Sequence, residues 1–240
     1  MRPILIQIGD VAVSSYAVMV ALALAVGWRV RRAEVQRLGY DRDPRLRWLG
    51  IGALLGAMAG AKLGMLLFED LGDFAHTVAR MRDFDFTGKT VVGGLAGGYL
   101  GVEIQKYFMG IRESTGDAWA LALPLGQAVG RLGCFLHGCC GGKPSELPWA
   151  VAGHHPAQLY ELALDLLLFA VIFWARRLPL PRGHLFKVYL AGYAVIRFGL
   201  EFLRIDAIPL ALGLSAVQWL CALAAVVLGG QLLRARTLQV

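Results

Sequence analysis

The chain has 240 residues, of which 57% are apolar and only 17% are charged. An ordinary soluble domain has about 25% charged residues, so this composition excludes a soluble globule, a disordered chain and a disulfide-rich miniprotein. The formal net charge is +7, but the basic residues stand at the ends of apolar runs, where membrane topology explains them better than nucleic-acid binding does. We therefore expect an integral membrane protein that binds no nucleic acid.

Seven apolar runs are candidates for spanning helices, which need about 20 mostly apolar residues each. In the third run, the pair Gly93-Gly94 begins a glycine-rich stretch that is tolerated in a membrane where helices pack closely or line a cavity. The pattern predicts an all-α, polytopic membrane protein that forms a single domain over residues 1–240. The predicted spans, in chain order, are 11–28, 48–68, 91–108, 119–135, 159–174, 185–203 and 212–233.

The distribution of Lys and Arg predicts the orientation. The connections on one side carry 15 of these residues, seven of them between residues 29 and 47, against five on the opposite side. Cytoplasmic connections are enriched in Lys and Arg, so the amino terminus is expected outside and the carboxyl terminus in the cytoplasm. The outward connection 69–89 has the helical spacing of an amphipathic segment facing the periplasm.

The sixth run contains a polar ladder at offsets of four, four and three residues, formed by Tyr193, Arg197, Glu201 and Arg204. These offsets place all four side chains on one helical face. Charged groups inside a span are costly and mark functional sites. Because two guanidinium groups share one carboxylate, a positive charge remains for an anion. The alternative is an ion-pair network that only joins helices.

Two neighbouring runs carry further polar candidates. Arg131, at the outer end of the fourth run, adds a third guanidinium. In the fifth run, Gln158 and Glu161 are placed to bind a hydroxylated group or to orient an arginine, and Asp165 to pair with Lys62 or another helix. Arginines that meet near the outer leaflet of a helical bundle suit the phosphate of a membrane lipid.

Five segments resemble the bacterial prolipoprotein diacylglyceryl transferase family: SSYAVMVA (14–21), GGLAGG (93–98), GRLGCF (130–135), HPAQLYE (155–161) and GYAVIRFGLEFLR (192–204). The resemblance implies a seven-span enzyme of the bacterial inner membrane that uses no cofactor. Its substrates would be phosphatidylglycerol and a lipobox-containing prolipoprotein. The diacylglyceryl group would move to the lipobox cysteine, forming a thioether and releasing glycerol phosphate.

The resemblance also implies roles by position. Arg131 and Arg197 are expected to bind or polarise the phosphate, and Tyr16 and Tyr193 to line the lipid site. Glu201 and Arg204 are expected to order their helix. The full set of candidate substrate-binding residues is Tyr16, Gly93, Gly94, Arg131, Gln158, Glu161, Tyr193, Glu201 and Arg204.

The chain also departs from the family pattern. Val92 stands where the family has a histidine before the paired glycines, so a general base is missing there. We expect a histidine elsewhere, His155 or His137, to deprotonate the incoming thiol, and His155 joins Arg131 and Arg197 as a candidate catalytic residue. The open alternatives are a related transferase with another acceptor, a non-catalytic lipid- or metal-binding protein and a thiol-redox protein.

The segment CFLHGCC (134–140) concentrates thiols and an imidazole at the outer end of the fourth run. Zinc favours such ligands, but the spacing is not that of a standard zinc site, so no metal is expected. A disulfide from Cys134 to Cys139 or Cys140 is a second interpretation. A third interpretation is that Cys139 accepts the lipid group covalently and hands it on. A fourth is that the cysteines only pack. The metal candidates are Cys134, His137, Cys139 and Cys140.

Overall fold

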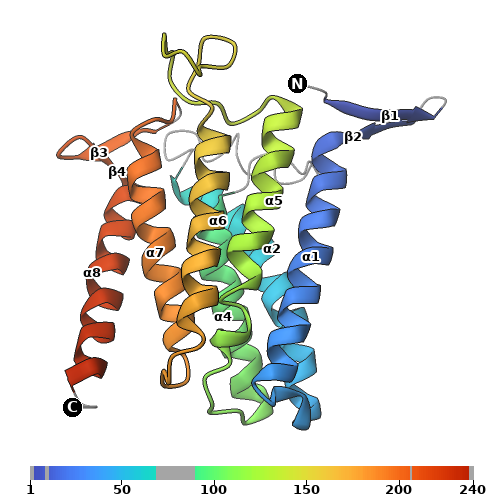
Figure 1. The fold of residues 1–240 in the computed structure, drawn as a ribbon, viewed down its shortest axis with the longest axis vertical. Helices are drawn as coiled ribbons and strands as arrows, with labels where there is room; N and C mark the ends of the chain where they lie inside the picture. Colours follow the sequence, from blue (N-terminus) through green and yellow to red (C-terminus); the bar gives the residue numbers. More distant parts are fainter. Residues whose placement is uncertain (1–2, 9–10, 69–89, 206, 238–240) are drawn as a thin grey trace. The chain divides into compact units, whose positions relative to one another are not determined.

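The computed structural model describes residues 3–8, 11–68, 90–205 and 207–237 (Figure 1). In this part of the chain the seven predicted runs coincide with seven α-helices, which confirms the all-α class. Their bounds are α1 (Ser15–Arg37), α2 (Leu49–Phe68), α4 (Val91–Met109), α5 (Ala122–His137), α6 (Ala157–Ala175), α7 (His184–Glu201) and α8 (Ala216–Thr237).

Four helical stretches in the described residues are long and apolar enough to cross a membrane. They are Pro44–Gly64, Gly116–His137, Ala157–Ala175 and Ala216–Arg234. Large apolar side chains such as Leu223 and Val226 on α8 are exposed, as is expected of helices that face lipid rather than water. The membrane character of the chain follows from these helices, while the total of seven spans and the orientation stay predictions.

Two predicted spans begin too early, because short hairpins precede their helices. Strand β1 (Ile4–Ile8) pairs antiparallel with β2 (Val11–Ser14), so residues 11–14 are extended rather than helical. Strands β3 (Pro209–Ala211) and β4 (Leu214–Ser215) form a second hairpin. Left-handed backbone at Leu212 and Gly213 makes its turn. The predicted amphipathic segment 69–89 lies outside the described residues.

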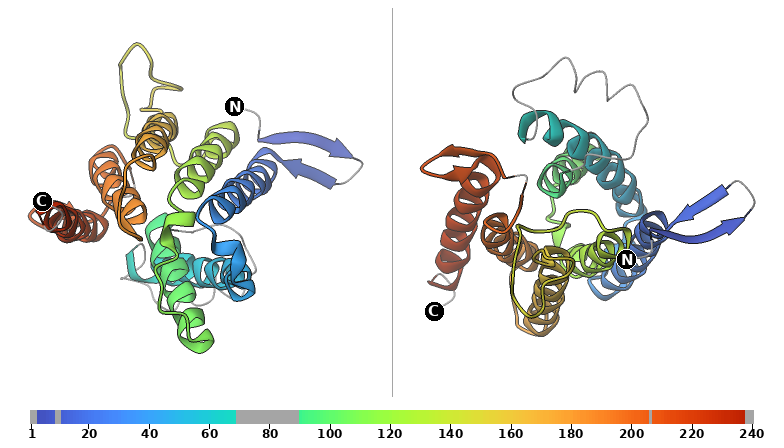
Figure 2. Two further views of the ribbon diagram at one scale, coloured as in Figure 1. Left: turned by 60° about the horizontal axis from the view of Figure 1, so that its bottom comes forward. Right: turned by 90° about the horizontal axis from the view of Figure 1, so that it is seen from above.

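The chain divides into two compact units, Met1–Leu38 with Ser114–Val240 and Gly39–Glu113. In the first unit α1, α5, α6, α7 and α8 pack in this order, each against the next (Figure 2). Both hairpins and the connection between α5 and α6 lie at one end of this unit, and the carboxyl end of α8 lies at the other (Figure 1).

The second unit consists mainly of α2 packed against α4. Glycines allow this approach: a Cβ added at Gly97 would overlap the carbonyl oxygen of Gly56, and one added at Gly93 would overlap that of Gly60. Close backbone contact through small residues four apart is typical of membrane helix pairs. Thr90 caps α4 by accepting a hydrogen bond from the Gly93 amide at 3.1 Å. The glycine-rich third run is therefore helical because it pairs with α2.

One buried ion cluster lies at the carboxyl end of α1, away from the hairpins of the first unit. The Glu34 carboxylate is 3% exposed. Its Oε2 accepts from Arg37 Nε at 2.7 Å and its Oε1 accepts from Arg176 Nη1 at 2.6 Å. Since each oxygen has a strong donor, this cluster ties α1 to the end of α6 and is complete in itself.

Candidate functional site

A second ion cluster joins α5, α6 and α7 at the end of the first unit that carries the hairpins. Arg131 Nη2 on α5 lies 2.8 Å from Glu161 Oε1 on α6. The same carboxylate oxygen accepts a hydrogen bond from the Tyr193 hydroxyl of α7 at 3.2 Å. All three side chains are buried. Glu161 therefore orients Arg131, which is one of the two roles that the sequence suggested for it.

The polar ladder on α7 forms as the spacing predicts. Arg197 Nη2 lies 2.6 Å from Glu201 Oε2, and Arg204 Nε lies 3.8 Å from the same oxygen. The other carboxylate oxygen accepts a hydrogen bond from the Ser215 hydroxyl at 3.1 Å. Tyr193 interacts electrostatically with both Arg131 and Arg197, so the ladder and the Arg131–Glu161 pair belong to one polar group in the first unit.

Among the described residues, one donor of this group, Arg197 Nη1, and one acceptor, Glu201 Oε2, have no hydrogen-bond partner. Arg197 Nη1 is buried and makes no hydrogen bond to any described residue. A buried N–H without a partner is destabilising by about 1–3 kcal/mol, and more for a charged group. The two oxygens of Asp165, which was expected to pair with another helix, also have no hydrogen-bond partner in the described part of the chain. The partnerless donor of Arg197 suits an anionic ligand. Asp165 brings no basic partner into the site, because its expected pairing does not form.

The connection after α5 is held against both α6 and α7. Gly142 donates its amide hydrogen to the carbonyl of His155 at 2.9 Å, and Lys143 donates to the carbonyl of Leu203 at 2.7 Å. The Gln158 side chain donates from Nε2 to the carbonyl of Cys139 at 2.6 Å. Gln158, a candidate substrate-binding residue, thus fixes the backbone between the cysteines.

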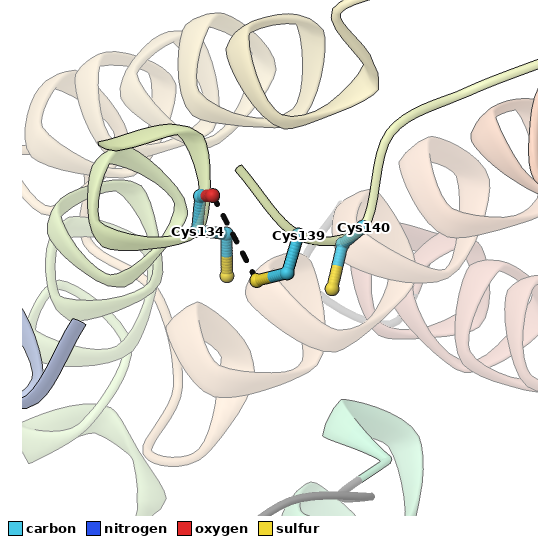
Figure 3. Close-up of side chains that lie close together, drawn as sticks. All are labelled: Cys134, Cys139 and Cys140. Atoms are coloured by element: carbon cyan, nitrogen blue, oxygen red, sulfur yellow. Dashed lines mark hydrogen bonds between the residues drawn. The ribbon is translucent and has the colours of Figure 1, made fainter. Parts of the chain in front are cut away.

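Three cysteines meet in this connection (Figure 3). The sulfur atoms of Cys134, Cys139 and Cys140 all lie within 4.8 Å of one another. Cys134 is buried in the last turn of α5, Cys139 is partly buried and Cys140 is exposed. These residues are free thiols, as is Cys221 in α8. The Cys139 thiol donates a hydrogen bond to the Cys134 carbonyl at 3.7 Å. The neighbouring Cys134 and Cys139 thiols lower the pKa of Cys140, and the charges of nearby arginines act in the same direction although burial opposes them.

The predicted histidines do not join the thiols. His155 Nδ1 lies 3.4 Å from the Tyr160 hydroxyl, which accepts a hydrogen bond from Trp149 Nε1 at 2.7 Å. His137 lies against Tyr16, with the ring centres 6.0 Å apart. Because these contacts are to aromatic residues, the structure supplies no imidazole–thiol pair among the described residues.

The remaining candidate substrate-binding residues lie in different units of the chain, Tyr16 in the first and Gly93 and Gly94 in the second. Tyr16, partly buried near the start of α1, interacts electrostatically with Arg131 and with the three cysteines. Gly93 and Gly94 belong to α4 in the second unit. Gly93 is in tight contact with α2, whereas a Cβ at Gly94 would meet only ordinary van der Waals neighbours.

Ser215 is a site residue that the sequence analysis missed. Its hydroxyl accepts from the Gln218 amide at 3.2 Å, and its own amide donates to Gln218 Oε1 at 2.9 Å. This reciprocal pair is a capping box at the start of α8. The S-x-x-Q pattern in SAVQ (215–218) is readable in the sequence and would have located the helix start, although not the contact to Glu201.

Fold and site together define a class: an integral membrane protein of packed helices with a buried, cationic polar group that suits a phosphate. Residues 3–233 match the family model described as prolipoprotein diacylglyceryl transferase. The chain belongs to this family, which confirms the resemblance seen in its motifs.

Individual relatives agree. The chain is 33% identical over 229 residues to a protein of Methylococcus capsulatus named phosphatidylglycerol–prolipoprotein diacylglyceryl transferase, covering 91% of this chain and 87% of the relative. It is 34% identical over 236 residues to a protein of the same name from Bordetella avium, covering 91% and 88%. A relative from Azoarcus carries the same name at 34% identity over 250 residues, with 91% and 89% covered.

Proposed function

We propose that this protein transfers the diacylglyceryl group of phosphatidylglycerol to a cysteine thiol of a prolipoprotein. The names of the relatives and the family match support this activity. The observation in the structure that carries it is the buried Nη1 of Arg197, a guanidinium donor without a partner among the described residues. A phosphate oxygen is a suitable acceptor for such a donor.

In this proposal, Arg131 and Arg197 bind the phosphate of the lipid. When the bond between the glyceryl carbon and the phosphate oxygen breaks, negative charge grows on the leaving glycerol phosphate, and fixed guanidinium groups stabilise it. Glu161 and Glu201 hold these arginines in place through the ion pairs at 2.8 and 2.6 Å. The four side chains therefore form a preorganised site rather than one that must assemble around the lipid.

The finer assignments are part of the same proposal. The chain crosses the bacterial inner membrane seven times as one domain, with its amino terminus outside, and the acceptor is the lipobox cysteine. Tyr16 and Tyr193 line the lipid site. Gly93 and Gly94 remain candidate substrate-binding residues, and His155 a candidate base.

A transfer assay tests the proposal. The full chain, purified into bilayer discs that contain phosphatidylglycerol, is incubated with a lipobox peptide, and mass spectrometry identifies the products. We expect a thioether-linked diacylglyceryl peptide and an equal amount of glycerol phosphate. A peptide with serine in place of the acceptor cysteine is the control and should remain unmodified. Lipid binding without any modified cysteine peptide would contradict transfer and favour a non-catalytic lipid-binding protein.

A further inference from the structure

We propose that Cys134, Cys139 and Cys140 bind a zinc ion, and that the fourth coordination position of this zinc receives the acceptor thiol. The metal site stands on the geometry of the three cysteines. The role of its fourth position rests on the transfer function proposed above.

The distances suit a zinc ion. Zinc–sulfur bonds of about 2.3 Å in a tetrahedral site place the sulfur atoms about 3.8 Å apart. The three sulfurs lie within 4.8 Å of one another, so each pair needs to close by about 1 Å at most. Figure 3 shows the Cys139 side chain pointing toward Cys134. In the proposed site, the two loop side chains, Cys139 and Cys140, rotate to close this distance.

The backbone of the loop is already held in the required shape. The Gln158 side chain holds the carbonyl of Cys139, and the backbone of Gly142 is bonded to that of His155. Cys140 has a φ of +61°, in the left-handed region that is unfavourable for a residue with a Cβ by roughly 1–2 kcal/mol. Strained backbone conformations of this kind cluster at functional sites, where a side chain must be held in a defined position. Here the strained residue is Cys140, which supplies the third sulfur of the group.

Charge and ligand number favour a catalytic zinc over a structural one. Three thiolates around Zn²⁺ carry one net negative charge, and the positive charges of Arg131 and Arg204 lie near Cys140. Within the described residues, no histidine or carboxylate completes the group. Three protein ligands with one open position are typical of catalytic zinc, whereas structural sites have four.

The open position lies close to the proposed phosphate site. Cys134 follows Arg131 by three residues on α5, a spacing that puts both on one helical face. Tyr16 interacts electrostatically with Arg131 and with all three cysteines. A thiol bound to this zinc would therefore approach a lipid whose phosphate is held by Arg131.

The chemical step balances without an oxidant or reductant. The acceptor thiol gives its proton to water and binds zinc as a thiolate. A sulfur electron pair then forms the bond to the glyceryl carbon, and the carbon–oxygen bond to phosphate breaks. Its electron pair stays on the glycerol phosphate oxygen, which Arg131 stabilises. The thioether product is a weak zinc ligand and leaves.

Cobalt provides a direct test of the metal site, because Co²⁺ replaces zinc and absorbs light strongly when thiolates bind it. We expect the metal-free full chain to bind about one cobalt per molecule with thiolate-to-cobalt absorption. Cys134→Ser, Cys139→Ser and Cys140→Ser should each lose this absorption, while Cys221→Ser, the matched control, should keep it. Equal binding by the three loop variants, or copper(I) binding in place of cobalt and zinc, would overturn the proposal.

The role of the fourth position is tested on the cobalt-loaded chain without phosphatidylglycerol. Adding the lipobox cysteine peptide should strengthen the thiolate-to-cobalt absorption, because a fourth thiolate joins the metal. The serine peptide should leave the spectrum unchanged. If the cysteine peptide also changes nothing, the acceptor does not bind the metal and this half of the proposal is wrong.

The transfer rate of the zinc-free chain shows whether the zinc proposal or the transferase proposal fails. A free cysteine is only a few per cent thiolate at pH 7, so removal of zinc should lower the transfer rate by about 30-fold, and added zinc should restore it. Full transfer without zinc would overturn the zinc proposal and leave the transferase intact. No transfer by a chain that binds cobalt and responds to the peptide would contradict the transferase and leave the metal site supported.

Discussion

In the described part of the first unit, the ion cluster around Glu34 and the cluster around Arg131 and Arg197 differ in how completely their polar atoms are hydrogen-bonded. In the Glu34 cluster, each carboxylate oxygen has an arginine partner, at 2.6 and 2.7 Å. In the cluster around Arg131 and Arg197, Glu201 Oε2 lies 2.6 Å from Arg197 Nη2 in an ion pair. However, this oxygen and Arg197 Nη1 are buried and have no hydrogen-bond partner among the described residues. The first arrangement is what a structural ion pair needs, and the second is what a ligand site needs, because a donor remains available.

The two clusters also lie at different ends of the same helix. Glu161 is in the first turns of α6 and Arg176 follows its last residue, so they are separated by about 22 Å along the axis at 1.5 Å per residue. A substitution in one cluster should therefore leave the other almost unchanged. This independence allows the comparison to be tested one cluster at a time.

Arg197 should show the largest effect on transfer. Arg197→Ala removes the available donor and should lower kcat/KM by roughly 10³-fold, as expected when a group that stabilises the leaving charge is lost. Because alanine also leaves Glu201 buried without its partner, Arg197→Lys is the second variant, which keeps the charge but loses the fork. It should fold normally and lose roughly 10²-fold. Near-normal turnover by the lysine variant would contradict the anion site.

Arg131 and Arg176 form a matched pair of arginines, one in each cluster. Arg131→Lys should lower kcat/KM by roughly 10²-fold, because a single ammonium cannot serve both Glu161 and a phosphate. Arg176→Lys should change transfer less than about twofold, since its site touches no substrate in this account. The measurement is the rate of thioether formation at varied phosphatidylglycerol content. Equal losses in the two variants would mean that both clusters are structural.

Glu34→Gln should act on stability rather than on transfer. The amide cannot neutralise Arg37 and Arg176, and we expect a loss of about 1–3 kcal/mol in the free energy of unfolding, limited by the partial exposure of both arginines. Thermal unfolding in lipid discs measures this loss, with the transfer rate of the folded fraction as the second readout. A specific fall in affinity for phosphatidylglycerol would contradict the purely structural role.

Tyr193→Phe should have the smallest effect. It removes the 3.2 Å hydrogen bond to Glu161 and leaves the ion pair of that carboxylate with Arg131 in place. One such bond contributes about 1 kcal/mol, so transfer should fall about fivefold while the melting temperature changes little. A loss as large as that of Arg197→Lys would mean that the hydroxyl itself takes part in the reaction.

The helices and the ladder were predictable because they depend on local periodicity. Offsets of four and three residues on α7 determine that Arg197 and Glu201 share a face, whatever surrounds them. The sequence suggested that Glu161 orients an arginine, but not which arginine, since the packing of α5 against α6 determines that the partner is Arg131.

The sequence placed the three thiols in one segment, but it did not show that their sulfur atoms meet. Their meeting depends on left-handed backbone at Gly138 and Cys140 and on the hydrogen bond from Gln158 to Cys139. Neither feature follows from the spacing of the cysteines. The sequence argued against a metal because this spacing is not that of a standard zinc site. Residues 11–14 were misassigned for a similar reason, because strand pairing outweighed an apolar run that suited a helix.

The most direct test of the central claim is retention of phosphatidylglycerol by the purified chain, measured by native mass spectrometry. The wild-type protein and Glu34→Gln should each retain phosphatidylglycerol, whereas Arg197→Lys should retain little, because the lysine lacks the second guanidinium donor, Arg197 Nη1, which has no partner among the described residues. Equal retention by Arg197→Lys and the wild-type protein would show that the unpaired guanidinium does not bind the lipid.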